Sequence, residues 1–247
     1  MEDVIFSYKK NSPVLNGLTM RAPKNSICAI LGHNGAGKTT LLRHMGKLIK
    51  LRSGKMAWGM KDNEGIGFMP EGIGLYPRLS GYDNLNIRLL AYKKNVDKKE
   101  IADILQKINL FEHADKQVGL WSTGMKRRLA LACSLTAAPA LLLLDEPFTG
   151  IDPASQKIML EMIQEKSRPC AIVFSIHGLH LVKNISTGIS VIKKENLNFI
   201  PIGGKIWKPL KRFTLTIMKN NQPRWRALRR LFTPIERGDS LPFGYGA

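Results

Sequence analysis

The sequence predicts an α/β domain built around a largely parallel sheet. Three short apolar runs, residues 26–31, 141–144 and 171–175, indicate buried strands. Continuous apolar strands are typical of parallel sheets, because helices cover both faces of such sheets. Helical patterns lie between these runs, and strands that alternate with helices favour a parallel arrangement.

The helices are predicted from their start signals. The first begins at Thr39, directly after a glycine-rich turn, and should continue to about residue 49. A second begins at Asp97, where Glu100 follows three residues later as the partner in a capping box. A third begins at Asp152, because a capping residue followed by proline is a common helix start. Residues 80–138 are predicted to be helical, as a subdomain inserted into the sheet.

Composition limits the class of protein. The chain has 247 residues, 44% of them hydrophobic, which is enough for a sizeable core. Its three cysteines are too few for a disulfide framework, so we expect a reducing compartment. No signal peptide follows Met1, and the longest weakly polar run, residues 129–144, is too short to span a bilayer. We therefore expect a chain that does not cross a membrane by itself.

The charge is strongly positive. There are 38 Lys and Arg against 19 Asp and Glu, which gives a formal net charge of +19. Residues 205–247 hold ten of the basic residues and two of the acidic ones. Such a chain favours an anionic partner: a nucleotide, an anionic membrane surface or a nucleic acid. A loosely packed or disordered tail is the favoured interpretation, and docking on a membrane or a partner through an apolar helical face around Trp225 is the alternative.

The glycine-rich turn matches the phosphate-binding pattern G-x-x-x-x-G-K-[ST]. Its residues are Gly32, His33, Asn34, Gly35, Ala36, Gly37, Lys38 and Thr39. Glycines let successive backbone N–H groups turn toward the phosphates, and the helix that follows adds the positive end of its dipole. Lys38 is predicted to neutralise the β- and γ-phosphates, and the Thr39 hydroxyl to ligate Mg²⁺. With Thr40 as a further nucleotide contact, the expected cofactors are ATP and Mg²⁺.

A second motif places two carboxylates at the end of an apolar strand. Residues 141–144 are four leucines, and Asp145 and Glu146 follow them. Beside the phosphate loop, Asp145 would hold the Mg²⁺ shell and Glu146 would polarise the attacking water. An apolar strand that ends in acids is common, and alone it would indicate only a strand terminus. Together with the phosphate loop it predicts nucleotide hydrolysis.

A third segment connects these motifs to a known family. Residues 121–125 read Trp-Ser-Thr-Gly-Met and precede an apolar helix. The combination resembles ATP-binding cassette nucleotide-binding domains, whose signature is LSGGQ. The resemblance implies that Ser122 and Gly124 bind the γ-phosphate of a partner cassette across a dimer. Thr123 and Met125 depart from the consensus and are similar to a subgroup of exporter ATPases.

The same resemblance assigns further residues. Tyr8 lies where an aromatic side chain stacks on adenine, although a core tyrosine is the alternative. His177 matches the histidine that contacts the γ-phosphate, and residues 149–152 resemble the loop that couples the two sites of a dimer. Glu71 stands where the family usually has glutamine, so an acceptor-only anion replaces a neutral amide. Glu71 is still expected to reach Mg²⁺ or the attacking water.

The resemblance covers residues 1–204 and implies an ABC ATPase fold. This fold is that of a P-loop NTPase, with a RecA-like parallel-sheet core, an amino-terminal antiparallel β subdomain and the inserted helical subdomain. It implies the ATP-hydrolysing motor subunit of an ABC transporter, peripheral on the cytoplasmic face of the membrane. Two cassettes, as a homodimer or a heterodimer, would close around ATP and drive export through a separate transmembrane permease. Residues 74–78 resemble the stretch that meets the permease.

Two other functions remain open. A cassette ATPase that acts on nucleic acid or ribosomes would explain the charge, but such relatives usually carry two cassettes or a long coiled coil. We therefore do not expect a nucleic-acid partner. A non-hydrolysing ATP-binding module would explain the amino terminus, where residues 1–7 supply a shorter first strand than the family usually has.

Overall fold

The structure, a computed structural model, describes residues 1–9, 12–60, 64–91, 95–136, 138–167, 170–177, 188–193 and 196–201. The basic tail at residues 205–247 lies outside these ranges, and so does its predicted apolar face around Trp225. None of the helices in the described ranges is long and apolar enough to cross a membrane.

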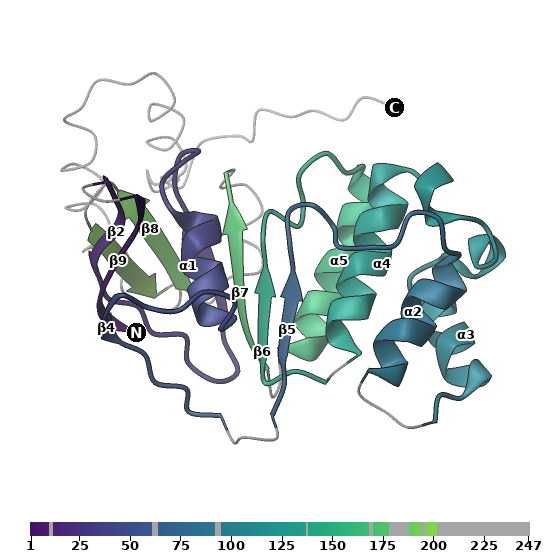
Figure 1. The fold of residues 1–247 in the computed structure, drawn as a ribbon. Coiled ribbons are helices and arrows are strands. Elements are labelled where there is room, and N and C mark those ends of the chain that lie inside the picture. Colours follow the sequence, from purple (N-terminus) through teal and green to yellow (C-terminus); the bar gives the residue numbers. More distant parts are fainter. Residues whose placement is uncertain are drawn as a thin grey trace, which may run out of the picture. The chain divides into compact units, whose positions relative to one another are not determined.

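The larger sheet is mostly parallel, as predicted. Within the described residues its strand order is β5-β6-β7-β3-β8-β9 (Figure 1). The strands are β3 (Ile27–Leu31), β5 (Ile66–Met69), β6 (Leu141–Leu144), β7 (Ala171–Ile176), β8 (Gly188–Lys193) and β9 (Asn196–Pro201). All neighbours pair in parallel except β9, which runs antiparallel to β8. The strands β3, β6 and β7 therefore end at one common edge.

A smaller antiparallel sheet forms at the amino terminus. It contains β1 (Glu2–Lys9), β2 (Ser12–Leu18) and β4 (Ser53–Lys55), in the order β2-β1-β4. On β1 and β2, the buried side chains are Val4, Phe6, Leu15 and Leu18. They fall largely on alternate positions, so one face of the sheet packs inward and the other meets solvent.

Helices fill the connections between the parallel strands. They are α1 (Lys38–Met45), α2 (Gly81–Leu90), α3 (Lys98–Lys107), α4 (Thr123–Leu135) and α5 (Pro153–Lys166), with 3₁₀ turns at Phe111–His113 and Val118–Leu120. The predicted N-caps are present, since Asp97 Oδ1 accepts from the Lys99 N–H and Asp152 Oδ1 from the Ser155 N–H. The bond at Asp97 goes to Lys99 rather than to the Glu100 N–H that the predicted capping box would use. The described part of residues 80–138 contains helices and no strand.

The first helix is shorter than the sequence predicts. It ends at Met45 rather than near residue 49. Gly46 donates back to the Leu42 carbonyl, and Lys47 then adopts a φ of 57° in the left-handed region, which closes the helix. Leu48 and Ile49 favoured a longer helix, whereas Gly46 was the stop signal that the prediction overlooked.

Two hydrophobic clusters lie on opposite faces of the larger sheet. Successive residues of β6 alternate between them, because Leu142 and Leu144 belong to one cluster and Leu141 and Leu143 to the other. The first cluster includes side chains of α2 to α5, and the second those of α1 and the smaller sheet. Figure 1 accordingly shows α1 and the pair α4 and α5 on opposite sides of β5, β6 and β7. With both faces covered, the carboxyl ends of the strands are where polar groups can gather.

Candidate functional site

The phosphate loop lies between β3 and α1. Gly35 and Gly37 have φ angles of 78° and 96°, in the left-handed region that glycine adopts without strain. A Cβ on Gly37 would lie 3.0 Å from the Val14 carbonyl oxygen and from Leu15 Cδ2, so a larger residue would crowd this position. No described side chain caps α1 at Gly37, and its first N–H groups remain available to an anion.

The other loop residues shape the turn. The His33 carbonyl accepts from the Ala36 N–H at 3.1 Å, and His33 Nδ1 lies 2.7 Å from the Asn34 carbonyl oxygen. His33 and Asn34 are exposed, whereas Ala36 packs in the hydrophobic cluster beside α1. The loop is therefore anchored at Ala36 and open at its tip.

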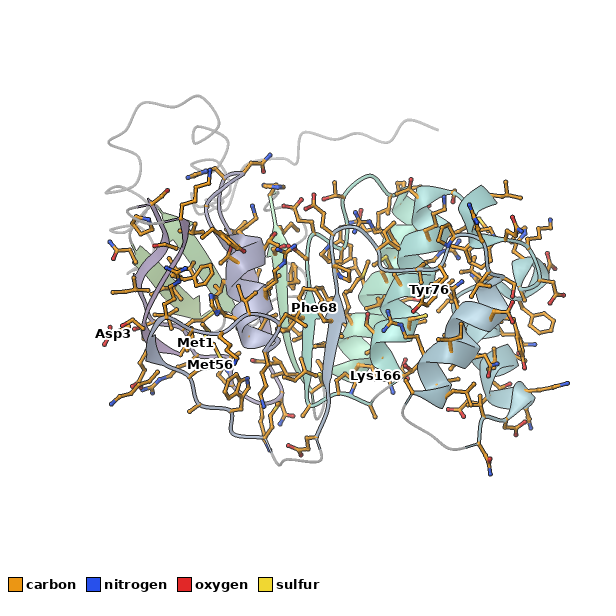
Figure 2. All side chains as sticks on the ribbon, in the orientation of Figure 1. Met1, Asp3, Met56, Phe68, Tyr76 and Lys166 are labelled. Atoms are coloured by element: carbon orange, nitrogen blue, oxygen red, sulfur yellow. The ribbon has the colours of Figure 1, made fainter. Side chains whose placement is uncertain are left out.

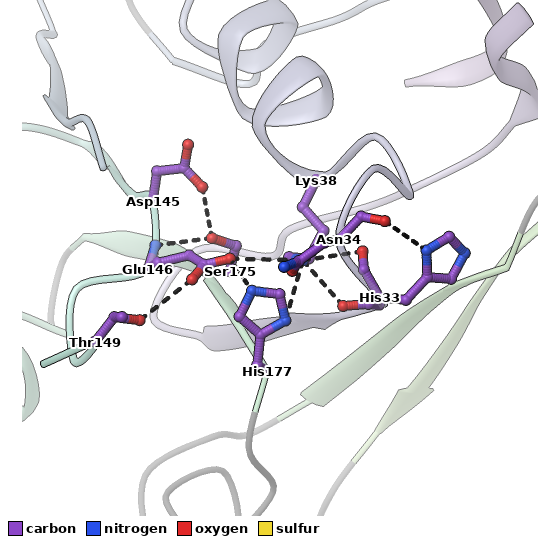
Figure 3. Close-up of polar contacts among 9 residues, drawn as sticks. His33, Asn34, Lys38, Asp145, Glu146, Thr149, Ser175 and His177 are labelled. Atoms are coloured by element: carbon purple, nitrogen blue, oxygen red, sulfur yellow. Dashed lines mark hydrogen bonds and ion pairs between the residues drawn. The ribbon is translucent and has the colours of Figure 1, made fainter. Parts of the chain in front are cut away.

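Lys38 lies at the centre of the site and is only 5% exposed. Its Nζ donates to the Gly32 carbonyl at 2.9 Å and to the His33 carbonyl at 3.2 Å, and lies 3.6 Å from Glu146 Oε1 (Figure 3). Burial lowers the pKa of Lys38, and the charge of Glu146 partly offsets this by raising it. The ammonium is thus surrounded by oxygen acceptors, which is the environment that phosphate oxygens also provide.

The two acids after β6 are held by a serine of β7. Ser175 Oγ donates to Asp145 Oδ1 at 2.6 Å, and the Glu146 N–H donates to Ser175 Oγ at 2.8 Å (Figure 3). Glu146 has a φ of 50°, which is uncommon for a residue other than glycine. Thr149 Oγ1 donates to Glu146 Oε2 at 3.2 Å. Both carboxylates are therefore fixed in orientation and largely buried.

His177 completes the cluster from the end of β7. Its Nε2 contacts Glu146 Oε1, and its Nδ1 lies 3.5 Å from Lys38 Nζ (Figure 3). With a proton on Nε2, the ring donates to the carboxylate and accepts from the ammonium. The structure therefore brings together the three predicted catalytic residues, Lys38, Glu146 and His177.

The start of α1 also carries Thr39, Thr40 and the predicted adenine contact. Thr39 is half-buried in the first helical turn, and the Thr40 hydroxyl lies 3.2 Å from the Tyr8 hydroxyl. The Tyr8 ring packs edge-on against Phe6, with 4.9 Å between centroids, yet Tyr8 is 52% exposed. Tyr8 is therefore not a core residue, and its exposed ring flanks the phosphate loop.

The predicted signature residues open α4. Ser122 is the N-cap, and its Oγ accepts from the Met125 N–H at 3.2 Å. Gly124 is buried against the start of α5, where a Cβ would lie 2.4 Å from Ser155 Oγ and 2.5 Å from Asp152 Oδ2. In the described part of the chain, neither residue shares a hydrogen bond or ion pair with the Lys38 cluster.

Glu71 lies on the loop that follows β5. It is exposed, and the loop turns directly after it, where the Ile73 N–H donates to the Pro70 carbonyl at 3.0 Å. Ile73 has a φ of 69°, a strained value for a β-branched residue. The far end of the loop is anchored, because the Tyr76 N–H donates to Asn84 Oδ1 of α2 at 2.8 Å. Figure 2 shows Tyr76 beside this helical layer.

Sequence reasoning missed two residues at the site. Ser175, which orients both acids, is a polar residue in the otherwise apolar strand β7, and that isolated polarity was the available signal. The other is Arg127 of α4, which is only 5% exposed. Burial lowers the pKa of Arg127, whereas the charges of Glu71, Glu146 and Asp145 raise it. No periodicity in the sequence distinguishes Arg127 from its basic neighbours.

The residues present fit Mg²⁺ that arrives with a nucleotide. The described residues contain no group of three or more His, Cys, Asp or Glu that could hold a metal ion alone. Mg²⁺ commonly takes one or two carboxylates and completes its shell with phosphates and waters. Asp145 supplies a buried, oriented carboxylate, and the Thr39 hydroxyl is on the adjoining helix turn.

Comparisons with known proteins identify the family of this chain. The family model described as ABC transporter matches residues 15–149. The lantibiotic transport ATP-binding protein SrtF of Streptococcus pyogenes is 35% identical over 192 residues, which cover 75% of this chain and 82% of that protein. The linearmycin resistance ATP-binding protein LnrL of Bacillus subtilis is 29% identical and covers 83% of this chain and 68% of its own length.

Solved structures support the fold. A dimeric ATP-binding cassette in a post-hydrolysis state, bound to ADP and Pi, aligns with a TM-score of 0.74 at 19% identity and covers 82% of this chain and 98% of its own. An ATP-binding subunit of an ABC transporter aligns with a TM-score of 0.71 at 22% identity, over 81% of this chain and 88% of that one. These likenesses confirm the predicted ABC ATPase fold. The chain therefore belongs to the ABC transporter family, as one of its ATP-binding ATPase subunits.

Proposed function

We propose that this subunit hydrolyses Mg-ATP at the Lys38 cluster and thereby drives export through a separate membrane permease. The observation that supports the catalytic part is the convergence of Lys38, Glu146 and His177 beside a phosphate loop. Bound Mg²⁺ would neutralise phosphate charge and orient the γ-phosphate. Thr39, Asp145 and Glu71 are the residues that would hold it.

Each side chain then has a role that follows from its position. Lys38 exchanges its carboxylate and carbonyl partners for β- and γ-phosphate oxygens, which offer it similar charge. Glu146 is released from Lys38 by this exchange and accepts a hydrogen bond from the attacking water. His177 redirects its Nε2 N–H from Glu146 to the γ-phosphate. Tyr8 stacks on adenine from the exposed face of its ring.

The signature residues act on a second cassette in this proposal. The α4 start carries an exposed hydroxyl, Ser122, and a helix dipole, but shares no hydrogen bond or ion pair with the Lys38 cluster of its own chain within the described residues. A head-to-tail dimer, of two copies or of two different cassettes, would place this start over the partner's γ-phosphate. Two ATP molecules at the interface would then close the dimer, and hydrolysis would open it.

The transport part of the proposal is supported by the names of two relatives and by one exposed hydrophobic surface. One relative is named for lantibiotic transport and another for linearmycin resistance. We propose export of a drug, peptide or lipid, with the chain peripheral on the cytoplasmic face of the membrane. The loop after β5 and α2 expose Tyr76, Ile87 and Leu90, and this surface is the proposed contact with the permease. The anionic membrane surface would attract the basic chain.

One experiment tests the whole proposal. Tagged Glu146→Gln protein, which should trap the ATP-bound dimer, is purified from membranes with and without Mg-ATP, and its partners are identified by mass spectrometry. We expect an integral membrane protein that remains bound, together with loss of ATP hydrolysis. Recovery of ribosomes or nucleic acid in place of a membrane protein would contradict the transporter assignment. Hydrolysis that persists in the variant would contradict the role of Glu146.

A further inference from the structure

Arg127 is a buried cation whose donors are not fully used. It is 5% exposed, and its Nε and Nη1 find no hydrogen-bond partner among the described residues. An unpaired buried guanidinium is costly, so its presence indicates a partner that reaches it in another state or an anionic field that stabilises it. The neighbouring Arg128 also has an Nε without a partner among the described residues, but its Nη1 donates to the Ile108 carbonyl at 2.6 Å and anchors a loop.

The helix that carries Arg127 runs from the carboxyl edge of the sheet back along β5. Its start at Gly124 packs on the start of α5, and seven residues after Arg127 the Ser134 hydroxyl donates to the Phe68 carbonyl at 3.3 Å. Two helical turns separate Arg127 from Ser134, which is about 10 Å along the axis. Glu71 is three residues beyond Phe68, and an extended chain covers that separation in about 10 Å. These two estimates place Arg127 and Glu71 at about the same height above the contact between Ser134 and Phe68.

Charge identifies Glu71 as the natural partner. Burial lowers the pKa of Arg127, and three carboxylates raise it, Glu71 ahead of Glu146 and Asp145. Glu146 already contacts Lys38 and His177, and Asp145 is bonded to Ser175. Glu71 forms no ion pair with any other described residue. It is also the one of the three that lies on an exposed loop, which has a strained φ at Ile73.

We propose that Arg127 is the positioning residue for Glu71. The buried guanidinium attracts the Glu71 carboxylate toward the carboxyl edge of the sheet and offsets its repulsion from Asp145 and Glu146. A neutral glutamine at residue 71 would need no such cation, whereas a third carboxylate beside two others does. The inference rests on the proposed function, because the positioned carboxylate serves the Mg-nucleotide. It makes Arg127 and Glu71 an interdependent pair.

A double-mutant cycle tests the pair. The variants are Glu71→Gln, Arg127→Gln and the double variant, with Lys157→Gln as a control that removes an exposed cation from α5. For each, kcat and KM for ATP, the Mg²⁺ concentration at half-maximal ATP binding, and the denaturant midpoint without nucleotide are measured. Arg127→Met serves as a second variant, because an apolar chain of similar length leaves no donor unpaired and should fold at least as stably.

If Arg127 and Glu71 depend on each other, their variants should show a specific pattern of kcat and Mg²⁺ dependence. At saturating Mg²⁺, Arg127→Gln should lower kcat by about tenfold or more and leave KM for ATP within about twofold, since positioning of the carboxylate is lost while the phosphate loop still binds ATP. It should also raise the Mg²⁺ requirement for ATP binding. Adding Glu71→Gln should restore kcat to within about threefold of the wild type, because a neutral pair has no unbalanced charge. The control should match the wild type in every measurement.

Two results would overturn the pairing. One is a double variant whose loss of kcat equals the product of the two single losses, since independent residues give multiplicative effects. The other is an Arg127→Gln or Arg127→Met protein that folds normally and keeps wild-type kcat and Mg²⁺ dependence. Failure of the proposed function looks different, because wild-type protein would then show no Mg-dependent hydrolysis. In that case the denaturant midpoints of the wild type, the two single variants and the double variant still show whether Arg127 and Glu71 are coupled.

Discussion

Lys38 and Glu146 form an ion pair across the phosphate loop, with 3.6 Å between Nζ and Oε1. Both side chains are nearly excluded from solvent, so their charges are screened less than those of surface pairs. The pair joins the group that should bind phosphate to the group that should activate water. Binding of ATP has to separate them, because the γ-phosphate and Glu146 compete for the same ammonium.

Glu146→Gln is therefore expected to change binding and turnover in opposite directions. Removing the carboxylate charge eliminates the competitor for Lys38, so ATP affinity should be equal to or higher than that of the wild type. Loss of the group that polarises the water should reduce turnover by ~10²–10⁴. Equilibrium binding of a fluorescent ATP analogue and phosphate release measure the two effects. Lys38→Ala is the comparison, and it should weaken ATP binding itself.

A second prediction concerns dimerisation through Ser122. In a Glu146→Gln background, Mg-ATP should produce a dimer that ADP does not produce. Ser122→Asp should abolish this dimer, because the carboxylate repels the partner's phosphate. Asp still caps a helix, so α4 should remain intact. Light scattering after gel filtration measures the mass, and Ser122→Thr is the control that keeps both hydroxyl and cap. A dimer that forms equally without nucleotide would contradict the role of Ser122.

A third prediction concerns the close contact between α4 and α5. Gly124→Ala should destabilise the fold by about 1–3 kcal/mol, because the added methyl overlaps Ser155 Oγ and Asp152 Oδ2. Gly59→Ala is a matched control, since a Cβ there meets no atom within 4 Å and its φ is not in the left-handed region. Chemical denaturation of the nucleotide-free proteins gives both values. Equal stability of the two variants would show that α4 and α5 separate easily.

A fourth prediction concerns the buried thiols. Burial raises the pKa of Cys133 to about 12 and that of Cys170 to about 11, and it also raises the pKa of Cys28. These thiols should be inert to a thiol reagent at pH 8 in the native protein and react once it unfolds. The raised values contribute stability that is complete below the unfolded pKa of 9.0 and is lost as pH rises toward 11 and 12. Thiol titration and unfolding midpoints across pH 8–11 measure the two effects.

The sequence was sufficient for the parts of the site that are local in the chain. The phosphate loop, the acids after β6 and the cap at Ser122 each occupy a few consecutive residues, so they could be recognised from the motifs in combination and from the family resemblance. The fold class followed because continuous apolar strands alternate with helices. The family comparison confirms the fold and the transporter assignment. The individual roles of Tyr8, Glu71 and the signature residues stay predictions.

The parts that were missed depend on packing between distant segments. Ser175 reaches Asp145 only because β6 and β7 pair in parallel with Leu144 opposite Phe174, which puts the next residues side by side. No local pattern specifies that register. Arg127 resembles its basic neighbours in the sequence and differs from them only in being buried beneath an acidic edge. The end of α1 at Met45 likewise depends on a left-handed turn at Lys47.

The alternation along β6 has a consequence for the evolution of the chain. Four leucines look interchangeable, and substitutions among aliphatic residues should be tolerated there. Insertion or deletion of a single residue should not be tolerated. The Asp145 N–H donates to the Met69 carbonyl and continues the strand, so the number of leucines before Asp145 decides toward which face of the sheet its side chain points. Losing one leucine would turn that carboxylate from the side of α1 to the side of the helical layer. Natural variants of this strand should therefore differ in composition while keeping its length.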